Sequence, residues 1–245
     1  MFSLLWTDYL VFALVIGVSL LIWRVSKKQH MVRPWKKVSD STVGVVSLTV
    51  LLSFVFIGVL DSTRIKYKPN LSNGEGGART ETLSVLDIVL TPIRTQVETT
   101  YSMPFAHTGY AKELLKDEQG ATQWVYPRLK YAGAHLASAV NEKPQDIITK
   151  AVEGVFLGFM CWLALVVLVL FFSKARSHKA RSKAQKNMAY TLLIIFSLAG
   201  MVASLGPYYH VLGTDKVGED VLYQAIKSIR TGLVIGTLTT LVMLP

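Results

Sequence analysis

Long apolar runs constrain this chain more than any other feature of its sequence. Four runs reach the length of about 20 residues that a helix needs to cross a hydrocarbon core about 30 Å thick. These runs are Leu4–Trp23, Thr42–Leu60, Gly154–Phe172 and Met188–Leu205, and the first is interrupted only by Asp8. A fifth run begins at Thr231 and is still apolar at Pro245. A single soluble domain is therefore excluded. We expect an all-α integral membrane protein with four complete transmembrane helices plus the start of a fifth.

Basic residues gather in two short loops beside these runs. Arg24–Lys37 and Lys174–Lys186 each hold six lysines or arginines and no acidic residue, whereas the whole chain has a net charge of only +10. A nucleic-acid-binding domain would spread its basic residues over one folded face. Basic loops that flank apolar spans are instead typical of a membrane protein. We therefore expect a lipid bilayer, and no nucleic acid, as the environment of this chain.

The same loops predict the orientation of the chain, because short cytoplasmic loops carry the excess of lysine and arginine. Both basic loops are predicted to be cytoplasmic, which places the N-terminus and residues 61–150 outside. The chain is then a multi-pass protein of the cell inner membrane. Residues 1–60 form an N-terminal helix pair and residues 61–150 an external, periplasmic segment. Residues 151–187 hold the third helix with its basic loop, and residues 188–245 hold the fourth helix and the C-terminal remainder of the chain.

The external segment of roughly 90 residues is predicted to be a small helical cap on the membrane domain, rather than a ligand-binding module. Asn70–Ala78 is a turn-rich linker. From Glu81 onward, apolar residues recur every three or four positions and predict a helix that Pro92 should kink or divide. Trp124–Tyr131 is expected to form a short strand or an interfacial turn. Pro144 suits the first turn of a helix that continues into the third span.

Residues with catalytic or metal-binding chemistry are sparse and scattered. Cys161 is the single cysteine, and none of the five histidines is paired at the spacing of metal ligands. No phosphate-binding loop or nucleophile arrangement is recognisable, so we expect no cofactor, no metal and no enzyme activity in this chain. Asp8 is interpreted as a charge that reaches the membrane interface. In the fourth run, Ala199/Ala203 and Gly200/Ser204 form a small-residue face suited to helix packing.

The segment after the fourth run has the most specific pattern. Gly213 and Gly218 permit backbone angles that other residues avoid, and they predict a tight external turn. Acidic residues at the end of this turn favour the start of a helix, because exposed N–H groups and the helix dipole attract negative charge. The apolar stripe of 221–230 then predicts an amphipathic interfacial helix. Gly232 and Gly236, four residues apart, would let another helix backbone approach closely.

This pattern resembles the permease subunits of bacterial ABC importers for dipeptides, oligopeptides and nickel. In that family a Gly-Thr-Asp-x-x-Gly-Arg-Asp turn follows the first core helix on the outer side. An interfacial helix, an arginine and the second core helix come next. The matching residues are Gly213, Thr214, Asp215, Gly218 and Asp220 in the turn and Arg230 after it. Glu219 stands where the family usually has arginine, and Ser228 where it often has glycine.

The resemblance implies a membrane-spanning permease component of an importer for peptides or related small solutes, working by alternating access. Its partners would be a second permease subunit, cytoplasmic ATPase subunits that use ATP, and an external solute-binding protein. Residues 188–245 would be the start of the permease core, preceded by an N-terminal extension that typical members lack. The ATPase-coupling loop of the family would lie beyond Pro245, so the chain is expected to be truncated.

The alternative is a membrane sensor or scaffold whose external segment binds a ligand and signals inward. Such a protein needs a cytoplasmic output domain. The cytoplasmic loops here are only about 18 and 15 residues long, which favours the permease.

Overall fold

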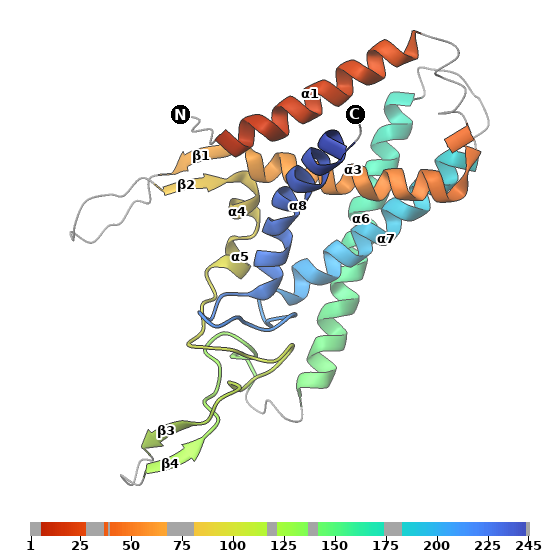
Figure 1. Ribbon diagram of the computed structural model, residues 1–245. Helices are drawn as coiled ribbons and strands as arrows, with labels where there is room; N and C mark the ends of the chain where they lie inside the picture. Colours follow the sequence, from red (N-terminus) through yellow and green to blue (C-terminus); the bar gives the residue numbers. More distant parts are fainter. Residues whose placement is uncertain are drawn as a thin grey trace. The chain divides into compact units, whose positions relative to one another are not determined.

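The computed structural model of the chain describes residues 6–27, 37–38, 40–67, 81–116, 122–136, 142–173 and 183–243. It is mostly helical (Figure 1). The long helices are α1 (Trp6–Ser26), α3 (Thr42–Ser62), α6 (Lys143–Ser173), α7 (Lys183–Leu205) and α8 (Val221–Met243). The chain forms two compact units, Met1–Thr91 with Ala225–Pro245, and Pro92–Gln224. We call them the first and the second unit and describe each by itself.

Three helices of the described residues are long and apolar enough to cross a membrane: α3, α6 and α7. They correspond to the second, third and fourth predicted spans. The first span is helical as α1, but its crossing of a membrane stays a prediction. The fifth region differs from expectation, since 221–230 is not a separate interfacial helix. It forms the first part of α8, which continues without a break to Met243.

Helices α6 and α7 lie side by side in the second unit, and glycines bring their backbones together (Figure 1). A Cβ at Gly154 would collide with the α7 backbone at Gly200, and one at Gly158 would collide with the backbone at Phe196. The Trp162 indole N–H also donates to the carbonyl oxygen of Ala189, at 3.0 Å. Gly200, in the predicted small-residue face, is therefore at the contact, and the Gly-x-x-x-Gly pair of α6 is its counterpart.

Two β-hairpins correct the expectation of an all-α chain with a helical external segment. Strand β1 (Arg64–Tyr67) pairs antiparallel with β2 (Glu81–Ser84), and β3 (Glu113–Lys116) pairs antiparallel with β4 (Thr122–Val125). The strand β4 agrees with the short strand considered around Trp124. The linker 70–78 lies outside the described residues, as do most positions of the two basic loops.

The helix predicted from Glu81 is wrong at its beginning, because the chain is a strand up to Ser84. There the Ser84 hydroxyl accepts from the Asp87 amide and the Asp87 carboxylate accepts from the Ser84 amide, both at 3.0 Å. This capping box starts α4 (Val85–Val89). A second short helix, α5 (Thr91–Arg94), contains Pro92, so the helix is divided where the proline predicted. Pro144 lies in the first turn of α6, also as predicted.

A small core in the second unit fixes the residues that come after α7. Leu136, Leu205 and Tyr209 are buried together, and Ile147 of α6 packs against them. The Tyr209 hydroxyl donates to Asp146 Oδ2 at 2.6 Å. Burial and this hydrogen bond raise the pKa of Tyr209, so the phenol stays protonated. The chain therefore leaves α7 in a fixed direction, toward the 213–220 turn.

Candidate functional site

The 213–220 turn contains five of the residues that match the permease motif, and its two glycines have backbones that only glycine adopts readily. Gly213 has φ of 78° and Gly218 has φ of 84°. Space is closed as well as φ. A Cβ at Gly213 would collide with the carbonyl oxygen of Ser102, and one at Gly218 would collide with the carbonyl oxygen of Glu98. The turn thus packs directly on the backbone of residues 98–102.

Backbone hydrogen bonds hold these two segments of the second unit together. The Glu98 amide donates to the Gly218 carbonyl oxygen, and the Phe105 amide donates to the His210 carbonyl oxygen, both at 2.9 Å. Upstream, the Gln96 side-chain amide donates to the carbonyl oxygen of Pro207, at 2.7 Å. Residues 96–105 therefore run beside 207–218 and form the surface against which the turn is built.

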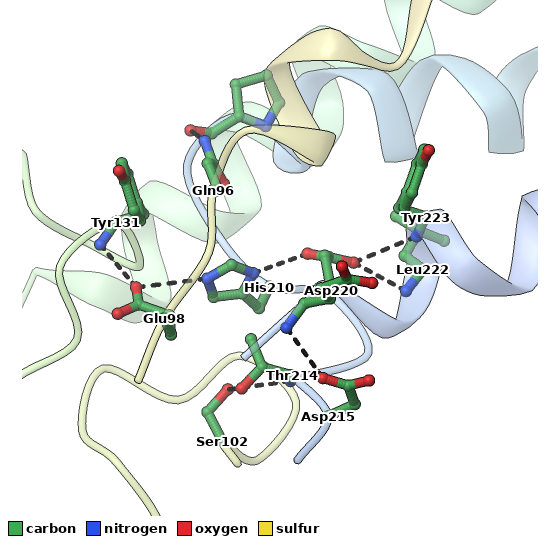
Figure 2. A network of polar contacts seen from close by, with 12 residues as sticks. Gln96, Glu98, Ser102, Tyr131, His210, Thr214, Asp215, Asp220, Leu222 and Tyr223 are labelled. Carbon is green, nitrogen blue, oxygen red and sulfur yellow. Dashed lines mark hydrogen bonds and ion pairs between the residues drawn. The ribbon is translucent and has the colours of Figure 1, made fainter. Parts of the chain in front are cut away.

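Thr214 is buried and uses its hydroxyl to join the two segments. The hydroxyl donates to the Thr100 carbonyl oxygen at 2.8 Å and lies 3.0 Å from the Ser102 hydroxyl. The Thr214 amide also lies 3.2 Å from the Ser102 hydroxyl and donates to it. Figure 2 shows Ser102 and Thr214 facing each other. A buried hydroxyl with these partners is satisfied, whereas valine at this position would leave Ser102 and Thr100 without them.

Asp215 closes the turn on its own backbone. Its Oδ1 accepts from the amides of Val217 and Glu219, at 2.9 Å each. Its Oδ2 accepts from the Gln224 side-chain amide at 2.7 Å. These hydrogen bonds, that of Gln224 foremost, hold the pKa of Asp215 below its usual value of 3.8. The same Gln224 nitrogen lies 3.1 Å from Glu219 Oε2, so glutamate, where the family usually has arginine, has its own partner here.

Asp220 is the N-cap of α8. Its Oδ1 accepts from the Leu222 amide at 2.8 Å and from the Tyr223 amide at 3.4 Å. Its Oδ2 lies 2.7 Å from His210 Nδ1. The acid at the helix start, expected from the sequence, is therefore a cap that also binds a histidine.

His210 links Asp220 to Glu98 in a buried row of three titratable groups (Figure 2). Its Nε2 is 3.5 Å from Glu98 Oε1, and the ring is completely buried. Glu98 in turn accepts from the backbone amides of Lys130 at 2.9 Å and Tyr131 at 2.8 Å. A protonated imidazole can donate from both ring nitrogens, one to each carboxylate. Each carboxylate has backbone donors as well, so the row binds the turn to residues 98 and 130–131.

This arrangement stabilises the fold and has no features of a catalytic or metal centre. The two carboxylates meet opposite nitrogens of the ring and do not converge on one point. Ser102, the neighbouring hydroxyl, is bonded to Thr214. Among the residues that the structure describes, no group of three or more His, Cys, Asp and Glu side chains could hold a metal ion. The network is thus a clasp around the turn, which we call the Glu98–His210–Asp220 clasp.

The remaining motif residues, Arg230, Gly232 and Gly236, lie on α8 in the first unit. Arg230 is not exposed: its Nη1 lies 2.8 Å from Asp8 Oδ1. Asp8 is completely buried, so its interpretation as an interfacial charge is wrong. A Cβ at Gly232 or Gly236 would meet no other described atom within 4 Å. The close helix approach predicted there is not made within the described part of the chain and stays a prediction for a partner.

Comparison with known proteins adds no relative. No family model matches the chain, and neither a curated protein nor a solved structure matches it. The functional argument therefore depends on the sequence motif and on the geometry of the turn. Glu98 and Ser102, which sequence reasoning missed, carry no local signal because they lie far from the turn in the sequence. His210, three residues before Gly213, was the one clue within the segment.

Proposed function

We propose that this chain is a membrane-spanning permease component of an ABC importer for peptides or related small solutes. One observation carries the proposal: each of the five motif positions in the turn has a contact that depends on its residue type. The two glycines have positive φ and no space for a Cβ. Thr214, Asp215 and Asp220 each satisfy buried or turn-forming backbone groups. A glycine-rich connection that resembled the motif by chance would not need threonine and aspartate at these positions.

The surrounding architecture supports transport rather than catalysis. Three helices of the described chain are suited to a bilayer, and the clasp is closed by its own hydrogen bonds. In the proposed protein, the turn lies on the outer side of the inner membrane and starts the helix α8. Transport would proceed by alternating access, with a second permease subunit, cytoplasmic ATPase subunits and an external solute-binding protein as partners. ATP would be bound by the ATPase subunits and not by this chain.

The test is solute uptake in the organism that carries the gene. Deleting the gene should reduce uptake of labelled di- or oligopeptides, and the intact natural gene should restore it. A copy with Thr214→Val should restore less, because Thr100 and Ser102 lose a hydrogen-bond partner. A copy with Lys216→Ala, an exposed position of the same turn, is the matched control and should restore uptake fully.

Two results would contradict the proposal. Deletion could leave the uptake of peptides and of nickel unchanged. Deletion could also abolish only a transcriptional response to an external ligand, with uptake intact, which would favour the sensor.

A further inference from the structure

Four charged side chains of the first unit meet in a buried cluster around Arg230. Arg230 Nη1 lies 2.8 Å from Asp8 Oδ1, and Arg230 Nε lies 3.1 Å from Asp61 Oδ2. Arg64 Nε lies 3.4 Å from Asp8 Oδ2. The cluster thus connects α1, the end of α3, strand β1 and α8, and it has two positive and two negative charges.

Burial makes this cluster consequential. The side chains of Asp8 and Asp61 are 0% and 1% exposed, and those of Arg230 and Arg64 are 15% and 14% exposed. A buried carboxylate is tolerated only when a cation or several hydrogen bonds compensate the lost hydration. Arg230 touches both carboxylates at once, which the planar guanidinium can do and a lysine ammonium can do only poorly. Removing Arg230 would therefore leave Asp61 and Asp8 undercompensated together.

The same face of α8 has contacts on both sides of Arg230. One turn earlier, Lys227 Nζ lies 2.8 Å from Asp87 Oδ1 of α4. One turn later, Leu233 packs on Gly58 of α3, where an added Cβ would lie 3.0 Å from Leu233 Cδ1. Residues three apart lie on one face of a helix. Lys227, Arg230 and Leu233 therefore form a continuous strip through which α8 binds the N-terminal part of the chain.

We infer that Arg230 is a positioning residue: with Asp8, Asp61 and Arg64 it forms an ionic lock that fixes α8 to α1 and α3. The motif arginine is thereby given partners from the first 64 residues, the part that the resemblance treats as an extension. The lock itself does not depend on what the protein transports. Its consequence for a transporter, that the N-terminal helix pair is part of the moving core and not a separate anchor, rests on the proposed function.

Disulfide cross-linking of the full chain in membranes tests the lock without any transport assay. Cys161 is replaced by serine, and Gly58→Cys and Leu233→Cys place one thiol on each side of the α3–α8 contact. The loss of the leucine side chain leaves space for the added Cβ at position 58. In this background we expect a high cross-link yield. Arg230→Ala should lower it at least about fivefold, because a broken buried ion pair is strongly destabilising, and Arg230→Lys should give an intermediate yield.

Charge exchange keeps the test decisive if Arg230→Ala also lowers the amount of protein. Asp61→Arg and Arg230→Asp should each reduce the yield, and the double variant should recover most of it. Lys216→Ala, a cation removed from the exposed part of the turn, should leave the yield unchanged. An unchanged yield in Arg230→Ala would overturn the lock, and so would a double variant no better than its two single variants. Loss of uptake with an intact cross-link would count against the permease proposal only.

Discussion

Replacing Gly218 by valine is the most exacting perturbation of the turn, because two independent terms oppose any larger residue there. The φ of 84° lies in the left-handed region, which costs a residue with a Cβ roughly 1–2 kcal/mol. The Cβ would also collide with the backbone of Glu98, which cannot rotate away as a side chain could. Overpacking of this kind costs about 1–3 kcal/mol.

The collision would also separate the Glu98 amide from the Gly218 carbonyl oxygen, now 2.9 Å apart, with a further loss of roughly 0.5–1.5 kcal/mol. Together these terms give about 3 kcal/mol or more. For a chain of this size, that corresponds to a fall of about 6–12 °C in the midpoint of thermal unfolding.

The assay is thermal unfolding of the purified protein in detergent, followed by the amount of monomer that survives heating. The matched control is Gly17→Val, since a Cβ at Gly17 in α1 would meet no other described atom within 4 Å. Gly218→Asn separates the two terms. Asparagine tolerates positive φ but still has a Cβ, so it should remain nearly as damaging as alanine. The reasoning is refuted if Gly218→Val unfolds at the same temperature as Gly17→Val.

Three further predictions concern the second unit. Asp220→Ala should cost about 0.5–2 kcal/mol through loss of the α8 cap, and Asp220→Asn, which keeps one cap oxygen, should cost less in the same thermal assay; equal losses would argue against capping. Gly158→Leu should separate α6 from α7 and lower the thermal midpoint far more than Gly17→Val, and a similar midpoint in the two variants would rule out the glycine contact. The lowered pKa of Asp215 adds stability that is present above its usual value of 3.8 and is lost as the pH falls through the lower folded-state value; hydrogen exchange at the Val217 amide, corrected for its intrinsic rate, should therefore lose protection below that pH, whereas protection that persists there would contradict the role of the carboxylate.

Features determined by local sequence were predictable. The span Thr42–Leu60 agrees with α3 to within two residues at its end, because an uninterrupted apolar run specifies a helix almost by itself. The turn was predictable for the same reason, since Gly213 and Gly218 mark positive φ and an acid before an apolar stripe marks a cap. Pro92 divided its helix as the missing N–H and the fixed φ require.

Features determined by distant contacts were not predictable from one sequence. Leu83 fits a helical period, yet it lies in β2, because its partner Ile65 comes from the strand just after α3. The role of Asp8 depends on Arg230, which lies at the other end of the chain. Nothing near Glu98 indicates that it binds His210. In each case the local pattern is compatible with two environments, and the tertiary contact decides between them.

The side of the membrane on which the 213–220 turn lies tests the central claim most directly, since the permease motif requires it to be external. Lys216→Cys, in a chain with Cys161→Ser, puts one thiol on the exposed part of the turn. Lys183→Cys, at the beginning of α7, puts one at the other end of the helix. In intact spheroplasts a membrane-impermeant maleimide should label position 216 and should label position 183 only after permeabilisation. Labelling of position 183 from outside, with position 216 protected, would contradict the predicted topology and the permease proposal with it.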